Sequence, residues 1–169
     1  RDKDRHVHHQ LMELALTERS QTDLGLSNFP GEFGDEYQER GKLGSGAFAE
    51  VFEVTVPPNQ RRALKVLHPY LTGDNKIKQR FKREAIALTG LKHEGLVQAY
   101  RMGETDTGTP YIEMELIKGQ TIKDAIAESA DGLFAPARAV ELTKQLLGVL
   151  CYIHDEGWHH RDIKPSNVM

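Results

Sequence analysis

The chain has 169 residues, of which 38% are hydrophobic and 28% are charged, and its formal net charge is −3. This composition is typical of a soluble globular protein with one domain, or one domain and part of another. Acidic and basic residues are nearly balanced, which excludes a strongly basic nucleic-acid surface. The longest apolar run, residues 146–153, is too short to span a membrane. The single cysteine, Cys151, excludes an intrachain disulfide and favours a reducing compartment, which we interpret as the cytoplasm.

Residues 1–36 are polar and rich in turn formers, and we predict a flexible leader or linker there. The histidines in this segment lack the partnered ligands of a structural zinc site, so a solvated tail is the better interpretation. They are His6, His8 and His9. Because the chain opens with Arg1 and not with methionine, we expect it to be a fragment at this end.

From Tyr37 onward the pattern favours an antiparallel sheet with one helix. Alternating apolar residues at 51–56, a turn at 57–59 and a second β-prone run at 63–67 predict a hairpin. Helical spacing follows over 77–91, with apolar residues on one side and basic residues on the other. Two further strands are predicted at 96–102 and 111–116.

After Gly119 the spacing becomes helical, first over 122–128 and then from Pro136 to His154. The longer helix carries two apolar stripes, so we expect it to be buried on several sides. Gly157 is predicted to end it, and a polar loop follows over 159–167.

Two glycines, Gly44 and Gly46, lie between strand-like flanks. Bare backbone at such a position can approach a phosphate and donate N–H groups to it. Taken alone the signal is weak, since a β-turn that requires glycine explains the same residues.

Alternation places Lys65 on a face of its strand that otherwise reads as buried, and Glu84 lies next to the apolar stripe of its helix. A buried charge needs a partner. The economical interpretation is that these two side chains pair, leaving Lys65 able to hold the phosphates of a nucleotide. Each side chain read alone is explained as well by snorkelling to water.

The strongest signal is the run His160-Arg161-Asp162-Ile163-Lys164-Pro165-Ser166-Asn167. It offers a carboxylate that can accept a hydroxyl proton, a cation for a transferring phosphoryl group and an amide oxygen for magnesium. Aspartate and asparagine in loops are usually turn formers, but the joint spacing makes that interpretation improbable.

Residues 36–169 resemble the eukaryotic-type protein kinase family, and the stretch around residues 67–69 is similar to bacterial members. The resemblance implies an α+β fold, with an antiparallel N-lobe and hinge over 37–117 and the start of a helical C-lobe over 118–169. It implies ATP and Mg²⁺ as cofactors. The nucleotide-binding residues it implies are Leu43, Gly44, Ser45, Gly46, Val51, Ala63, Lys65, Met114, Glu115 and Ile117.

The resemblance also implies chemical roles. Asp162 corresponds to the catalytic base, Lys164 to the residue that assists at the γ-phosphate, and Asn167 to a magnesium ligand. Lys65 and Glu84 complete the catalytic set as the family's ion pair. Since a lysine at position 164 is typical of the serine/threonine branch, the expected activity is transfer of phosphate from ATP to a serine or threonine of a protein.

Three departures from the family pattern are present, and in one of them Trp158 and His159 stand where such proteins usually place small or aliphatic residues. Ala49 stands in place of the third glycine of the loop, which is a mild change. No Asp-Phe-Gly segment follows Asn167, so we expect negligible phosphotransfer from this chain alone and activity in the intact parent.

Two other functions remain open at this stage. One is a pseudokinase or nucleotide-binding scaffold, which the joint presence of Lys65, Glu84, Asp162 and Asn167 argues against. The other is a small-molecule kinase of related fold, which Lys164 argues against by resemblance.

Overall fold

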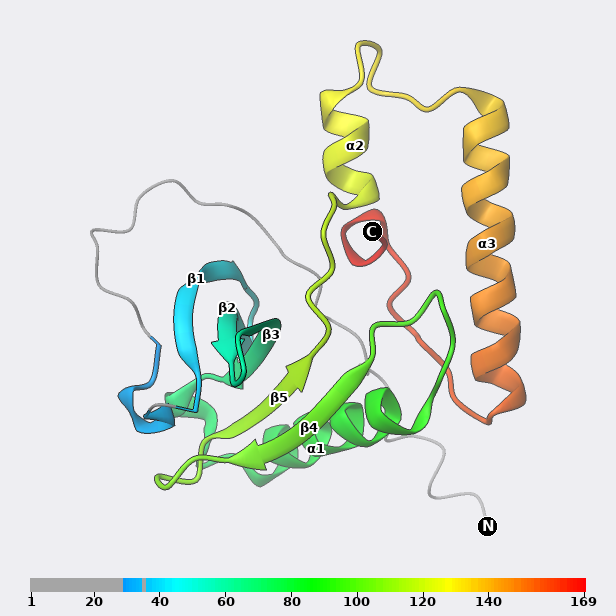
Figure 1. Cartoon of the computed structure of the whole chain (residues 1–169). Helices are drawn as coiled ribbons and strands as arrows, with labels where there is room; N and C mark the ends of the chain where they lie inside the picture. The colour runs from blue at the N-terminus through cyan, green and yellow to red at the C-terminus, as the bar shows by residue number, and fades with distance from the viewer. Residues whose placement is uncertain (1–28, 35) are drawn as a thin grey trace.

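The computed structural model describes residues 29–34 and 36–169, so the predicted features of residues 1–28 lie outside the described residues. Five strands form one antiparallel sheet in the order β1-β2-β3-β5-β4. Figure 1 shows α1 beside β4. Helices α2 and α3 lie beyond the end of the sheet at which the chain leaves β5. The bounds are β1 (Gln38–Ser45), β2 (Ala49–Val56), β3 (Gln60–Leu67), α1 (Asn75–Gly90), β4 (Ala99–Glu104), β5 (Pro110–Met114), α2 (Ile122–Glu128) and α3 (Pro136–Asp155). Short 3-10 segments occur at Gly31–Phe33, Pro69–Leu71 and Pro165–Asn167.

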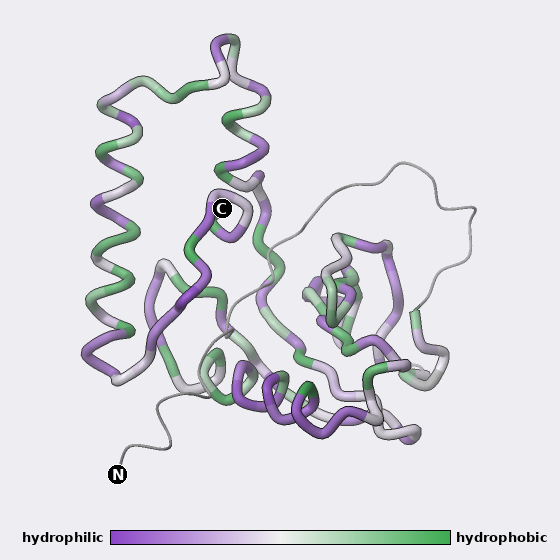
Figure 2. Tube along the Cα trace, turned by 180° about the vertical axis from the view of Figure 1, so that it is seen from behind, coloured by the Kyte–Doolittle hydropathy of each residue, from purple (hydrophilic) through white to green (hydrophobic). Residues whose placement is uncertain are grey.

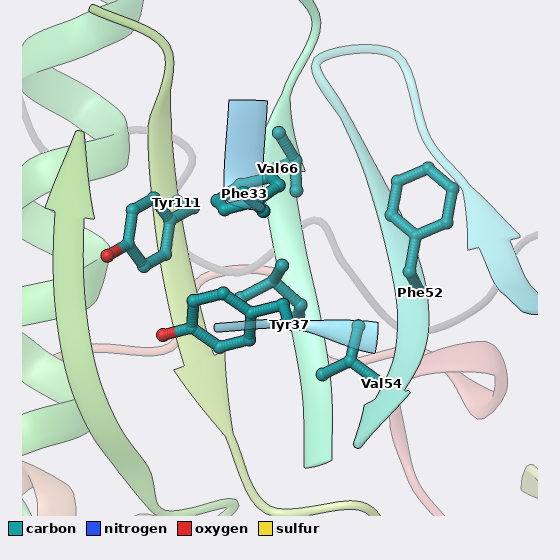
Figure 3. Packing of buried hydrophobic residues seen from close by; sticks show 7 residues of the cluster. Phe33, Tyr37, Phe52, Val54, Val66 and Tyr111 are labelled. Carbon is teal, nitrogen blue, oxygen red and sulfur yellow. The ribbon is translucent and has the colours of Figure 1, made fainter. Parts of the chain in front are cut away.

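The two faces of the sheet carry separate apolar clusters, because successive side chains of a strand point to opposite faces. The face that is turned away from α1, called the outer face, carries a largely aromatic cluster (Figure 3). This cluster consists of Phe33, Tyr37, Phe52, Val54, Leu64, Val66 and Tyr111. The cluster on the inner face packs against α1 and consists of Ala49, Leu67, Phe81, Ala85, Ala99 and Ile112. The predicted α+β architecture is confirmed.

The end of the predicted leader is part of the outer cluster. Phe33 is 7% exposed, and its ring packs edge-on against Tyr37 and Tyr111 with centroids 5.4 Å and 5.1 Å away. Phe29 contacts Phe33 and Phe52, each with centroids 5.2 Å apart. The prediction of a flexible leader up to residue 36 therefore fails for these aromatic residues, because the sheet offers them an apolar face to cover.

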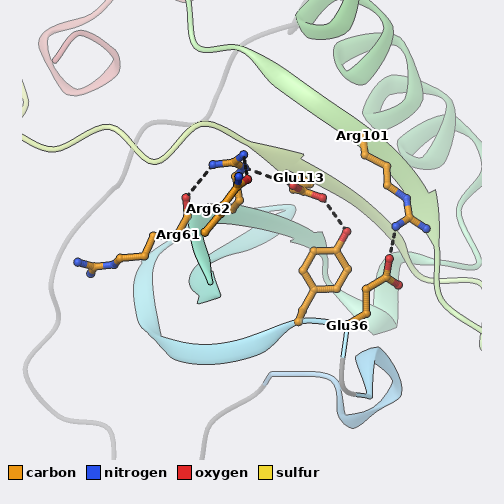
Figure 4. Close-up of polar contacts among 7 residues, drawn as sticks. Glu36, Arg61, Arg62, Arg101 and Glu113 are labelled. Carbon is orange, nitrogen blue, oxygen red and sulfur yellow. Dashed lines mark hydrogen bonds and ion pairs between the residues drawn. The ribbon is translucent and has the colours of Figure 1, made fainter. Parts of the chain in front are cut away.

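Polar contacts reinforce this attachment (Figure 4). The Arg101 guanidinium on β4 donates to the Glu36 carboxylate, and the Tyr37 hydroxyl donates to the Glu113 carboxylate over 2.9 Å. Burial, followed by the hydrogen bond to Glu113, raises the pKa of Tyr37 well above its ordinary value, so this hydroxyl stays protonated. The segment before β1 is thus tied to the strands at the other edge of the sheet.

Replacing Phe33 with leucine is expected to lower the free energy of unfolding by about 1–2 kcal/mol, because the two edge-on ring contacts are lost while most of the volume is kept. Urea denaturation measures the change. The exposed Leu133→Ala variant is the control and should stay within about 0.5 kcal/mol of the parent. An unchanged midpoint for Phe33→Leu would show that the ring contacts of Phe33 add nothing to the stability of the fold.

Asp74 determines where α1 begins. Its side chain caps the helix by accepting hydrogen bonds from the backbone N–H groups of Lys76 and Ile77, 2.8 Å and 3.3 Å away. The helix buries Phe81 and Ala85 against the sheet, while its other side is strongly hydrophilic (Figure 2). The amphipathic spacing that predicted this helix thus places its apolar side on the sheet.

In this chain α3 is not buried on several sides. Ile153 is its one buried residue, and Val140 and Leu147 are 53% and 54% exposed. The helix is attached near its C-terminal end, where the Tyr152 hydroxyl accepts from the Lys92 backbone N–H over 3.0 Å. In the part of the chain that the structure describes, no helix combines the length and apolarity needed to cross a membrane.

Candidate nucleotide and phosphoryl-transfer site

A cavity of about 370 Å³ lies between the sheet and the segments that follow it. Its size is within the range of small-molecule sites. Its lining includes eight residues that the sequence analysis assigned to nucleotide binding or to the ion pair: Leu43, Val51, Ala63, Lys65, Glu84, Met114, Glu115 and Ile117. Asn167 also lines it, and its opposite wall contains Leu146, Val149, Leu150 and Ile163.

The glycine-rich turn connects β1 and β2 at the edge of this cavity. The Gly46 backbone N–H donates to the Ala49 carbonyl over 2.8 Å and closes the turn. The pairing of β1 with β2 is irregular near Gly44, just before the turn. Leu43 and Val51 reach the cavity from the two strands, whereas Gly44, Ser45 and Gly46 are not part of its lining.

Lys65 and Glu84 form the predicted ion pair. Lys65 lies in the middle of β3 between Val51 on β2 and Ile112 on β5, and its side chain is 1% exposed. The ammonium donates to the Glu84 carboxylate of α1 and lies 5.5 Å from the centre of the Phe81 ring. Burial lowers the pKa of Lys65 below its ordinary 10.5, and the Glu84 carboxylate opposes that shift. The pair therefore places one desolvated cation in the wall of the cavity.

The segment after β5 forms another part of the wall. Met114 is the last residue of β5, and the Glu115 backbone N–H donates to the Gln98 carbonyl over 2.9 Å. This bond holds residues 115–117 beside the segment that precedes β4. Apolar side chains from the sheet and from α3 therefore line the cavity on either side of the backbone of residues 115–117. This arrangement suits a flat heterocyclic ring.

The loop over 160–167 brings three polar groups to one point. The Asp162 carboxylate accepts from the Lys164 ammonium over 3.0 Å and from the Asn167 amide nitrogen over 2.8 Å. The same Asn167 nitrogen donates to the Asp162 carbonyl over 2.8 Å, which closes the loop. Arg161 adopts a left-handed backbone conformation with φ of 63° that makes this tight path. Asp162 and Lys164 are not part of the cavity lining, so their groups lie outside it.

The His160 side chain holds this loop through a hydrogen bond. It is 7% exposed, and its Nδ1 accepts from the Asp162 backbone N–H over 3.3 Å, which requires an unprotonated Nδ1. Burial lowers the pKa of His160 below its ordinary 6.5, while the Asp162 carboxylate opposes the shift. The end of the loop is held by α2, whose Ile122 N–H donates to the Val168 carbonyl over 2.8 Å.

Acid is expected to destabilise the fold through His160. Its folded pKa lies below the unfolded value of 6.5, so the unfolded chain binds the extra proton and the free energy of unfolding falls as pH drops below about 6.5. Urea denaturation at a series of pH values between 5 and 8 measures this fall. The His160→Gln variant removes this titration and should show a shallower decline, whereas parallel profiles for the two proteins would contradict the assignment.

Some wall residues were not predicted from the sequence. Leu146, Val149 and Leu150 on α3 were assigned only to the core of a buried helix, although they form the wall opposite the sheet. Helical spacing shows that such residues share a face but not what the face covers. In the described ranges no cluster of three or more histidine, cysteine, aspartate or glutamate side chains forms a metal site.

Comparison with known proteins gives the family. Residues 37–169 match the protein kinase domain. The chain is 36% identical over 139 residues to a protein named as a probable serine/threonine-protein kinase PknB of Corynebacterium glutamicum, covering 80% of this chain and 21% of that protein. It is 36% identical over 155 residues to serine/threonine-protein kinase PksC of Streptomyces coelicolor, covering 87% of this chain and 28% of that protein. The chain thus spans between about a fifth and somewhat more than a quarter of the length of these relatives.

A solved structure agrees with this assignment. The kinase domain of Mycobacterium tuberculosis PknI superposes with a TM-score of 0.67 at 29% sequence identity, covering 78% of this chain and 53% of that domain. The buried Lys65–Glu84 pair and the Asp162 loop lie within the matched residues. The chain belongs to the protein kinase domain family.

Proposed function

We propose that the protein carrying this chain is a serine/threonine protein kinase that transfers the γ-phosphoryl group of ATP to a hydroxyl of a protein. The observation that carries the proposal is the Asp162 carboxylate, held by Lys164 and Asn167 near a cavity whose far wall contains the buried Lys65–Glu84 pair. Such an arrangement supplies positioning and charge stabilisation, which are what phosphoryl transfer requires of a protein.

Each group then has a defined task in the proposed reaction. The adenine lies against the apolar lining and the backbone of residues 115–117, and the Lys65 ammonium holds the phosphates. The Asp162 carboxylate accepts the proton of the attacking hydroxyl, and Lys164 stabilises charge on the transferring group.

One residue of the loop offers an oxygen ligand for a magnesium ion. Asn167 turns its amide nitrogen toward Asp162, and its carbonyl oxygen, to which the Ser166 hydroxyl lies 3.4 Å away, is of the type that Mg²⁺ prefers. We assign Asn167 as a protein ligand of the ion. When bound, Mg²⁺ would supply positive charge that offsets the negative charge of the phosphates.

Serine and threonine are the proposed acceptors because Lys164 occurs in the loop and because the relatives are named as serine/threonine kinases. A chain segment with one cysteine suits a reducing compartment, and we propose that this segment lies in the cytoplasm.

The test is phosphotransfer from radiolabelled ATP to a generic basic protein by a complete kinase domain that carries this chain. We expect magnesium-dependent label on serine and threonine after acid hydrolysis. Binding of Mg-ATP without any transfer would contradict the proposal and indicate a nucleotide-binding scaffold. Label on a small-molecule hydroxyl in place of protein would indicate a different substrate class.

A further inference from the structure

His68, directly after β3, makes two hydrogen bonds to the tip of the glycine-rich turn. Its backbone N–H donates to the Phe48 carbonyl over 2.9 Å, and its ring nitrogen Nε2 lies 2.9 Å from the Gly46 carbonyl oxygen. A carbonyl oxygen can only accept, so Nε2 carries the proton and donates. One residue thus holds the turn at two points outside the β1–β2 pairing.

The surroundings of His68 fix the orientation of its ring. The imidazole is stacked on the Tyr70 ring, with centroids 5.1 Å apart and planes inclined by 16°. Pro69 follows at once and begins a 3-10 turn, in which the Leu71 N–H donates to the His68 carbonyl over 2.9 Å. Both backbone groups of His68 are therefore engaged, and the side chain has a defined direction.

The same short segment also positions the charged groups of the cavity. Lys65 lies three residues earlier on β3, and the segment continues through the cap residue Asp74 into α1, which carries Glu84. The hydrogen bond from His68 thus connects the turn above the nucleotide site to the elements that hold the Lys65–Glu84 pair.

Glycine-containing turns lose much conformational freedom when they are ordered, and a ligand that orders such a turn loses affinity accordingly. A bond that holds the Gly46 carbonyl before the ligand arrives reduces this cost. In the closed turn the Gly46 N–H already donates to Ala49, so the His68 bond fixes the second polar group of the same residue.

We propose that His68 is a positioning residue that holds the glycine-rich turn in the conformation that receives the phosphates of ATP. The inference rests on the proposed function, since it assigns the ligand of that site. Loss of His68 should weaken only the binding of the phosphates, because His68 contacts the turn and does not line the cavity.

The test compares the binding of Mg-ATP and of adenosine to the 169-residue chain by titration calorimetry. For His68→Ala we expect ATP to bind about threefold to tenfold more weakly, the range for loss of one neutral hydrogen bond. Adenosine affinity should stay within about twofold, because that ligand has no phosphates for the turn to contact. His68→Gln places an amide N–H near the former Nε2 and should restore most of the ATP affinity.

The controls separate this role from a general effect on folding. His154→Ala removes another imidazole, exposed on α3, and should leave both affinities unchanged. Unchanged ATP binding in His68→Ala would overturn the inference alone, as would equal losses for ATP and adenosine or failure of glutamine to restore affinity. Absence of ATP binding by the unsubstituted chain would overturn this inference alone, because the proposed function is tested by phosphotransfer with the complete kinase domain.

Discussion

Replacing Glu84 with leucine is expected to lower the free energy of unfolding by about 3–5 kcal/mol, because it leaves the Lys65 ammonium buried without a counter-charge. Lys65 is 1% exposed and lies between β2 and β5 beside the Phe81 ring, so little water reaches the ammonium to replace the lost carboxylate. Urea denaturation of the chain at pH 7 measures the change.

The double variant Lys65→Leu with Glu84→Leu removes both charges. It therefore separates the cost of leaving Lys65 without its partner from the cost of losing the whole ion pair. Since apolar residues of similar size often replace a buried ion pair at little cost, the double variant should recover most of the lost stability. Glu128→Leu, an exposed substitution at the end of α2, is the matched control and should change stability by less than about 0.5 kcal/mol. A Glu84→Leu variant as stable as the control would contradict the buried pair.

This pair was predictable from the sequence because both signals are local. Strand alternation placed Lys65 on a buried face, and helical spacing placed Glu84 beside the stripe that contains Phe81. Two buried side chains of opposite charge have few alternatives to pairing. The loop from His160 to Asn167 was equally predictable, since the hydrogen bonds and the ion pair that hold Asp162 join residues at most five apart.

The features that were missed depend on contacts between distant segments. Nothing near Phe33 in the sequence shows that its ring packs on Tyr111, 78 positions later, so the aromatic residues before β1 were assigned to a leader. Strand β4 begins at Ala99 and not at the predicted residue 96, because Leu96 enters a turn closed by its N–H and the His93 carbonyl.

The role of α3 was ambiguous for a related reason. An apolar periodicity indicates that a face prefers burial but not which element covers it. In the structure one part of that surface lines the cavity through Leu146, Val149 and Leu150, and another part, including Leu147, is exposed. Similarly, the stretch around residues 67–69 was noted only for its similarity to bacterial members, because the role of His68 depends on the place where β3 ends relative to the turn.

Replacing Asp162 with asparagine in a complete kinase domain that carries this chain is expected to lower kcat by about 10²–10⁴-fold, the range for loss of a general base. Asparagine keeps the size of the side chain and an oxygen that can accept from Asn167 or Lys164, so the loop should keep its shape. The change therefore removes the proton acceptor and leaves the ATP cavity, which Asp162 does not line, intact.

Steady-state kinetics with ATP and a protein substrate measure the result, and the KM for ATP should change by less than about threefold if binding is unaffected. Asp131→Asn, in the exposed loop between α2 and α3, removes the same charge away from the site and should keep full activity. A large rise in the KM for ATP with unchanged kcat would instead place Asp162 in nucleotide binding. Since Lys164 contacts the same carboxylate, Lys164→Met in the Asp162→Asn background should cost less than it does alone.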